Sequence, residues 1–152
     1  MSMSIKVLLV DDHALVREGL KQLFSLTSDI CVAAEAINGS QLLEALHNQH
    51  FDIILLDMTM PGISGLDLIA RIKARTDAPP MLILSMHNEL QIARRALAAG
   101  AAGYITKDNN PEILLAAVRK IAGGGRFNDP VLTHSMSNSH RHPWWISTDP
   151  EP

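Results

Sequence analysis

The chain of 152 residues has little cysteine, few aromatic residues, no surplus of positive charge and no long apolar run. Its single cysteine, Cys31, cannot form an intramolecular disulfide, which is typical of proteins from a reducing cytosol. Because Cys31 lies within the apolar stretch ICVAAEAI, we expect it to be a small buried residue. Aromatic residues make up only 4% of the chain, so a core must be built from aliphatic side chains.

These absences also argue against two classes of function. The formal net charge is −3, whereas a nucleic-acid-binding surface normally shows as a basic excess. No segment reaches the roughly 18 consecutive apolar residues that indicate a membrane span. The first apolar run is short and ends in two acids, unlike a signal peptide. We therefore expect a cytoplasmic protein that binds no membrane and, through this chain itself, no nucleic acid.

Short apolar runs alternate five times with longer amphipathic stretches. The apolar runs predict strands at 5–10, 30–36, 52–56, 81–85 and 103–106. The amphipathic stretches predict helices near 14–26, 39–49, 64–75, 88–99 and 111–122. Such an alternation predicts an α/β fold, in which a parallel sheet is covered by helices on both faces.

Residues that can carry chemistry stand at the carboxyl ends of the predicted strands. Asp11 and Asp12 follow the first strand, and Asp57 follows the third. Ser85 ends the fourth strand and Lys107 follows the fifth. In open α/β sheets, ligands bind at this edge, where the strand order reverses. The acids meet there only if the first and third strands are neighbours, as in the flavodoxin-like order 2-1-3-4-5. We therefore predict a five-stranded parallel sheet in this order, within a three-layer (βα)5 sandwich.

Each of these residues has a simpler explanation when it is taken alone. An aspartate after an apolar strand is most often a turn residue or a helix cap, which applies to Asp57 and to the Asp11–Asp12 pair. Lys107 alone is most often a solvated lysine, and Ser85 alone a turn hydroxyl. The four features at four strand ends of one α/β pattern nevertheless favour a functional site.

Three carboxylates at one edge of a sheet indicate a cation site. At about 5 Å and an effective dielectric constant near 20, each pair of carboxylates repels by roughly 3 kcal/mol. Oxygen ligands favour a hard divalent ion, and Mg2+ commonly keeps open positions beside one or two carboxylates. Asp57 could then act as a nucleophile on a phosphoryl group, while Lys107 neutralises the transferred charge. The Ser85 hydroxyl could donate a hydrogen bond to a phosphate oxygen.

Residues 4–123 resemble the receiver domain of bacterial two-component response regulators. The resemblance rests on Asp11-Asp12, on Asp57 within LLDMTMPGISG, and on Ser85, Tyr104 and Lys107. The stretches LSMH (84–87), ALAAGAAGYITKD (96–108) and AAVRKIAGGG (116–125) are most similar to the NarL/FixJ-type subfamily.

The resemblance implies a phosphorylation site. Asp57 would accept a phosphoryl group from a sensor histidine kinase, and Lys107 would pair with the phosphate. Asp12 and Asp57 would bind Mg2+ directly, Asp11 through water, and Thr59 through its backbone carbonyl. The chain would catalyse only its own phosphorylation and a slow autodephosphorylation, so it would not be an enzyme in the usual sense.

The resemblance also implies a switch and partners. Ser85 and Tyr104 would be a switch pair that changes the surface formed by the fourth helix, fifth strand and fifth helix. That surface, or the one formed by the first and fifth helices, would support a homodimer. Four basic residues on these helices would form either a solvated face or a partner patch; they are Arg94, Arg95, Arg119 and Lys120.

The end of the chain departs from the subfamily pattern. We divide it into a receiver domain at 1–125 and a tail or start of a linker at 126–152. NarL/FixJ-type proteins normally continue into a helix-turn-helix domain, and the 27 residues after Gly125 are too few for one. A full-length form would regulate transcription by binding DNA. The alternative is a stand-alone receiver that acts through protein–protein contacts.

Two other functions are disfavoured by single positions. An aspartate-nucleophile phosphohydrolase of the haloacid-dehalogenase kind needs a second acid two residues after the nucleophile, where this chain has Thr59. A nucleotide or flavin binder needs a phosphate cradle after the first strand, but DDHALV replaces a glycine-rich loop there.

Overall fold

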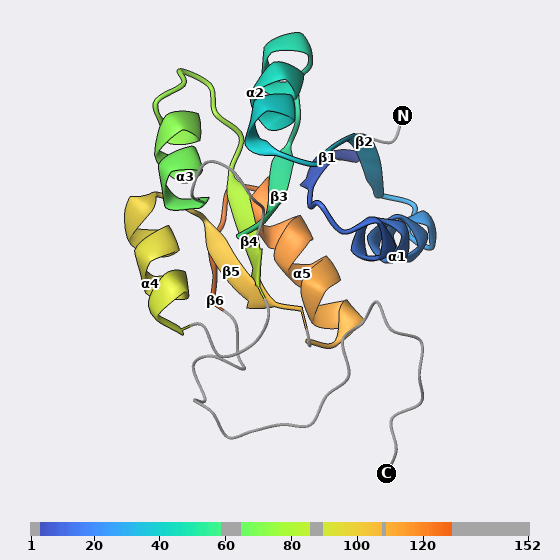
Figure 1. The fold of residues 1–152 in the computed structure, drawn as a ribbon. Helices are drawn as coiled ribbons and strands as arrows, with labels where there is room; N and C mark the ends of the chain where they lie inside the picture. The colour runs from blue at the N-terminus through green and yellow to red at the C-terminus, as the bar shows by residue number, and fades with distance from the viewer. Residues whose placement is uncertain (1–3, 59–64, 86–89, 108, 129–152) are drawn as a thin grey trace.

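The computed structural model describes residues 4–58, 65–85, 90–107 and 109–128 (Figure 1). Its central strands are parallel and lie in the predicted order β2-β1-β3-β4-β5. Their bounds are β1 Ile5–Val10, β2 Ile30–Ala36, β3 Ile53–Asp57, β4 Met81–Ser85 and β5 Gly103–Thr106. The predicted flavodoxin-like arrangement is therefore confirmed.

In the part of the chain that the structure describes, five helices connect the strands, within two residues of the predicted bounds. They are α1 Ala14–Ser25, α2 Gly39–Asn48, α3 Gly65–Lys73, α4 Leu90–Ala99 and α5 Pro111–Ala122. The start of α5 follows the sequence signal, because the Asn110 side chain accepts a hydrogen bond from the Glu112 N–H at 2.8 Å and Pro111 begins the helix. Among the described residues, no helix is long and apolar enough to cross a membrane.

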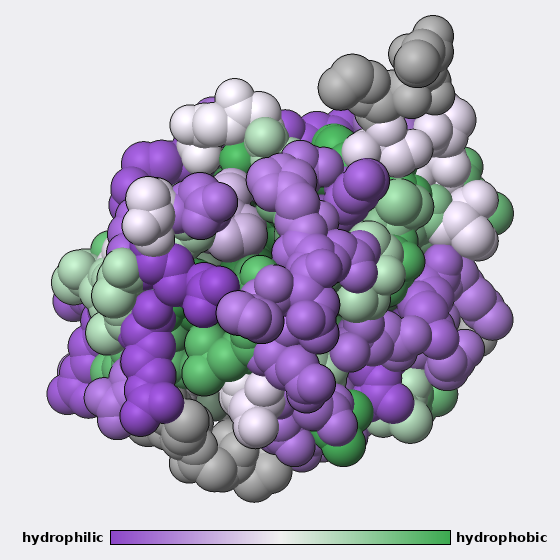
Figure 2. Space-filling model, turned by 90° about the horizontal axis from the view of Figure 1, so that it is seen from above, coloured by the Kyte–Doolittle hydropathy of each residue, from purple (hydrophilic) through white to green (hydrophobic). Residues whose placement is uncertain are grey.

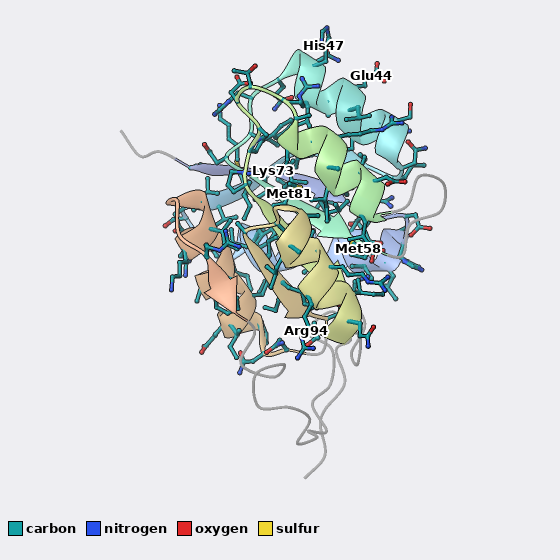
Figure 3. The ribbon with its side chains drawn as sticks, turned by 90° about the vertical axis from the view of Figure 1, so that its left-hand side faces the viewer. Glu44, His47, Met58, Lys73, Met81 and Arg94 are labelled. Atoms are coloured by element: carbon teal, nitrogen blue, oxygen red, sulfur yellow. The ribbon has the colours of Figure 1, made fainter. Side chains whose placement is uncertain are left out.

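The sheet separates two apolar cores, which gives the molecule three layers. On one face, Leu20 and Phe24 of α1 and Val118 of α5 pack against the odd-numbered side chains of β1 and β3. On the other face of the sheet, α2, α3 and α4 lie side by side and cover the even-numbered side chains of β1 and β3 (Figures 1 and 3). All five residues of β3 and of β4 are buried, so these strands form the centre of the fold.

A short sixth strand, β6 (Phe127–Asn128), extends the sheet beyond the five predicted strands. It pairs in parallel with β5, with Phe127 opposite Gly103 and Asn128 opposite Tyr104. The close approach depends on the glycine. A Cβ on Gly103 would lie 2.6 Å from Cδ1 of Ile121 and 3.0 Å from the carbonyl oxygen of Phe127.

The expectation that Cys31 is buried was wrong, because its side chain is exposed. Cys31 lies in β2, at the edge of the sheet, where only Ile30 and Ala36 are buried. An apolar run does not reveal whether its strand is central or at an edge. In this strand, neither face is fully covered.

An ion pair joins α5 to the turn that precedes β2. Arg119 in α5 donates two hydrogen bonds to the Asp29 carboxylate, at 2.8 and 3.0 Å. The bonds from Arg119 hold the pKa of Asp29 below its usual value, and the same pairing raises the pKa of Arg119. Arg119 thus makes an intramolecular ion pair, whereas Arg94 and Arg95 on α4 are exposed.

Hydrophilic side chains cover most of the face in Figure 2, with hydrophobic ones in smaller areas between them.

Candidate functional site

The register of the sheet brings the predicted site residues to one edge. Val10 is opposite Leu56, so Asp11, the next residue after β1, lies beside Asp57 at the end of β3. Asp57 is opposite Leu84, so it lies beside Ser85 on its other side. Lys107 immediately follows β5, and its backbone N–H donates to the Ser85 carbonyl oxygen at 2.7 Å.

Two acids and a lysine form a buried group at the centre of this edge. Lys107 Nζ lies 3.2 Å from Asp11 Oδ2 and 3.3 Å from Asp57 Oδ1. The side chains of both acids are 0% exposed and that of Lys107 is 3% exposed. One ammonium thus neutralises only one of two buried carboxylates, and burial makes the remaining negative charge costly unless another cation is present.

The rim of the site adds a third carboxylate and an imidazole. The Asp12 side chain is 29% exposed and that of His13 is 58% exposed. His13 Nδ1 lies 3.2 Å from Asp11 Oδ1, 3.3 Å from Asp12 Oδ1 and 3.9 Å from Asp57 Oδ2. The sequence analysis did not single out His13. The signal that could have identified it is its place directly after the two acids.

Hydrogen bonds hold the turn that carries the acids. The Asp11 N–H donates to Ala36 O at 3.0 Å, and Asp11 Oδ1 accepts the His13 backbone N–H at 2.8 Å. From α1, Arg17 donates to the Asp11 carbonyl oxygen and to Glu35 Oε1, both at 2.9 Å. The turn is therefore fixed both to β2 and to the first turn of α1.

Glu35 supports this turn from the neighbouring strand. Burial raises its pKa, but hydrogen bonds from Lys21 and Arg17 outweigh burial and hold the pKa below the usual value. Glu35 is thus ionised and can keep Arg17 in place against the backbone of Asp11.

Ser85 and Tyr104 lie together on the other side of the site. Both are buried, Ser85 at 0% and Tyr104 at 1% exposure. Tyr104 is opposite Ile83 and Thr106 is opposite Ser85, so these four residues share one face of the sheet. Tyr104 belongs to the core beneath α2, α3 and α4. The two residues of the predicted switch pair are thus diagonal neighbours on β4 and β5, with the tyrosine on the inside of the molecule.

Two residues follow β3 directly. Met58 is partly buried beside the start of α3 (Figure 3), where its sulfur would lie 2.6 Å from a Cβ on Gly65. Met58 is thus a residue that fills a gap in the core. Thr59, the predicted carbonyl ligand, lies outside the described residues, so its place in the site stays a prediction.

The donor atoms of the site are close enough to share one ion. Asp11, Asp12, His13 and Asp57 each offer an atom, and these four atoms lie within 4.8 Å of one another. Carboxylate oxygens are the ligands that Mg2+ prefers, and the three acids outnumber the one buried lysine. The residues therefore fit a divalent cation that compensates the surplus negative charge.

A comparison with protein families shows to which family the chain is similar. Residues 7–119 match the family model described as the response regulator receiver domain. The nitrate/nitrite response regulator protein NarL of Escherichia coli K12 is 38% identical over 135 residues, covering 89% of this chain and 62% of NarL. The response regulator UvrY of Escherichia coli K12 is 34% identical, covering 91% of this chain and 64% of UvrY. The chain thus spans less than two thirds of the length of these relatives.

Solved structures agree with the family match. A two-component response regulator of the LuxR family from Aurantimonas sp. SI85-9A1 superposes with a TM-score of 0.81 at 32% identity, covering 88% of this chain and 96% of that one. The receiver domain of the putative response regulator NarL from Mycobacterium tuberculosis gives 0.75 at 34% identity, covering 80% and 98%. The chain belongs to the response regulator receiver domain family, and its relatives are of the NarL/FixJ type.

Proposed function

We propose that this chain is a phosphorylation-dependent switch in which Asp57 accepts a phosphoryl group from a sensor histidine kinase. The observation that carries the proposal is the pairing of a fully buried Asp57 carboxylate with Lys107 at 3.3 Å, beside a second buried acid. A carboxylate held at the tip of a strand next to a fixed ammonium is placed to attack phosphorus and to have the new charge neutralised.

The acids would hold Mg2+ in this function. Asp12 and Asp57 would bind the ion directly, Asp11 through a water molecule, and Thr59 through its carbonyl oxygen. The Asp11 carboxylate already accepts hydrogen bonds from Lys107 and from the His13 backbone N–H, which favours a water-mediated role. When bound, Mg2+ supplies positive charge to the phosphoryl oxygens as negative charge builds on them.

Asp57, Lys107 and Ser85 would each have a separate role in the transfer. A carboxylate oxygen of Asp57 forms a bond to phosphorus while the bond from phosphorus to the donor's imidazole nitrogen breaks. The released imidazole takes up a proton, and Asp57 becomes an acyl phosphate. The Lys107 side chain pairs with the phosphoryl oxygens, and the Ser85 hydroxyl donates to one of them.

The phosphate would become a signal through Ser85 and Tyr104. Phosphorylation takes Asp57 from about −1 to nearly −2 and adds acceptor oxygens that attract the Ser85 hydroxyl. Because Tyr104 is buried on the same face, its inward position would be stabilised when Ser85 moves toward the phosphate. The surface of α4, β5 and α5 would then change. A crystal structure with a beryllofluoride phosphate mimic that leaves this surface unaltered would contradict the switch.

The output would lie in contacts with other proteins or in a longer chain. The relatives include a protein described as transcriptional regulatory protein DegU, from Brevibacillus brevis. We therefore propose transcription regulation in the cytoplasm for a longer form, with DNA bound outside residues 4–128. A homodimer through the α4-β5-α5 surface or through α1 and α5 would couple phosphorylation to that output.

Phosphate release and intact mass together test the proposal against a hydrolase. The protein is incubated with Mg2+ and a small phosphodonor, and both quantities are followed over time. A switch accumulates one phosphoryl group per chain and releases phosphate slowly. Rapid release over many turnovers without an adduct would overturn the proposal and favour a phosphohydrolase.

A further inference from the structure

His13 stands at the N-cap of α1, but its side chain does not cap the helix. The backbone at His13 is extended, with φ −97° and ψ 112°, and its ring makes no capping hydrogen bond. Ser, Thr, Asp and Asn are the residues that favour this position, because their side chains accept an N–H of the first turn. The imidazole is turned instead toward the acids of the site, where Nδ1 faces all three.

The atoms around His13 Nδ1 are spaced like ligands of one ion. Two ligands at right angles, each about 2.1 Å from a metal ion, lie about 3 Å apart. Nδ1 lies 3.3 Å from Asp12 Oδ1 and 3.9 Å from Asp57 Oδ2, the two acids proposed to bind the ion directly. Nδ1 is within hydrogen-bond distance of Asp11 Oδ1, so without a metal ion an Nδ1–H can donate to that carboxylate, and a divalent cation among these atoms would take the place of that hydrogen.

We propose that His13 Nδ1 is a ligand of the divalent cation and gives this site an added affinity for transition metal ions. The inference rests on the proposed function, since it concerns the same cation site. Mg2+ prefers carboxylate oxygens, whereas transition metal ions, Ni2+ and Zn2+ above all, also accept an imidazole nitrogen. A site of three acids and one imidazole therefore binds Mn2+ or Ni2+ through nitrogen and oxygen, and Mg2+ mainly through oxygen.

The turn around His13 is built to keep the ring in place. The His13 backbone N–H donates to Asp11 Oδ1, and its carbonyl oxygen accepts the first helical hydrogen bond, from Arg17 N, at 3.1 Å. The ring nitrogen Nδ1 also lies within hydrogen-bond distance of Asp11 Oδ1, at 3.2 Å, so the ring is held toward the acids while its side chain stays 58% exposed. This half-exposed position leaves room for water or a phosphoryl oxygen at the remaining positions around an ion.

Pulsed electron paramagnetic resonance of bound Mn2+ tests the nitrogen ligand directly. The full chain should show coupling of the Mn2+ electron spin to an imidazole nitrogen, and His13→Ala should abolish it. Histidines elsewhere provide the controls. The first control is His50→Ala, which removes an exposed ring at the opposite end of the sheet, beside a cavity of about 250 Å³. The second control is H134A/H140A/H142A, which removes the three histidines of the tail. Both controls should keep the coupling, and its absence from the unaltered protein would overturn the proposal.

Affinities for Mg2+ and Ni2+ provide the second readout, measured by calorimetry in the H134A/H140A/H142A background. His13→Ala should weaken Ni2+ binding by about tenfold or more, because even partners outside the coordination shell are worth 10–100-fold. Mg2+ binding should change by no more than about twofold. If His13→Ala tightens both ions equally, the ring competes with the cation and the proposal is wrong. If it changes neither, His13 is no ligand.

A second variant and a separate assay keep these outcomes distinct. His13→Ser restores a favoured N-cap residue, so it should lose the nitrogen coupling while α1 stays at least as stable. The Mg2+-dependent phosphoryl adduct should form in the unaltered chain whether or not His13 is a ligand. Failure of the nitrogen coupling alone therefore rejects the role of His13, whereas failure of the adduct rejects the proposed function.

Discussion

Replacing Lys107 by methionine is expected to lower the free energy of unfolding by about 3–5 kcal/mol, the cost of breaking a buried ion pair from one side. Lys107 is the buried cation between Asp11 and Asp57, at 3.2 and 3.3 Å. Methionine keeps the length and most of the volume of the side chain, so the decrease in the free energy of unfolding measures the loss of the charge rather than the creation of a cavity. Urea denaturation in metal-free buffer measures it.

Two comparisons make this result specific to the site. Lys120→Met changes an exposed lysine at the end of α5 and should shift the free energy of unfolding by less than about 0.5 kcal/mol. Adding Mg2+ should recover part of the loss in Lys107→Met, because the ion neutralises the same carboxylates. Equal stability of the two variants in metal-free buffer would contradict the buried ion pair.

Replacing Asp57 by asparagine is expected to stabilise the protein, in contrast to Lys107→Met, and to raise the free energy of unfolding by about 1–3 kcal/mol in metal-free buffer. Asp57 has two acidic neighbours, Asp11 and Asp12, and one basic neighbour, Lys107. At an effective dielectric constant near 20, the attraction at 3.3 Å is worth about 5 kcal/mol and each repulsion at up to 4.8 Å about 3.5 kcal/mol, so the two repulsions outweigh the attraction by about 2 kcal/mol. Burial of the Asp57 carboxylate adds to the cost that asparagine removes.

The double variant separates this explanation from a general effect of either substitution. Lys107→Met/Asp57→Asn should be more stable than Lys107→Met alone, because one buried acid is gone. The stability that Mg2+ adds should also shrink in Asp57→Asn, since the ion loses a ligand. Asp77→Asn, an exposed acid in the α3–β4 loop, should change neither quantity. A less stable Asp57→Asn protein in metal-free buffer would show that repulsion does not dominate the site.

The position of the site could be predicted because it follows from the strand order. Asp11, Asp57 and Ser85 each end or follow an apolar run, and the acids meet only where the first and third strands are neighbours. The observed register places these strands side by side, with Val10 opposite Leu56 and Asp57 opposite Leu84. A pattern of apolar runs fixes such relations because every central strand must be buried on both faces.

Other features depend on contacts that no local pattern encodes. The direction of the His13 ring results from an N-cap conformation and from hydrogen bonds across the turn, not from its residue type. The exposure of Cys31 results from the edge position of β2. The pairing of β6 depends on the space that Gly103 leaves beside Phe127, which becomes visible only when β5 and α5 are placed together.

The central claim is that Asp57 itself carries the phosphoryl group, and peptide mapping after incubation with Mg2+ and a small phosphodonor tests it most directly. The account predicts one adduct per chain, located on the peptide that contains Asp57 and absent from Asp57→Asn. An adduct on a different residue, or one that forms equally in Asp57→Asn, would contradict it.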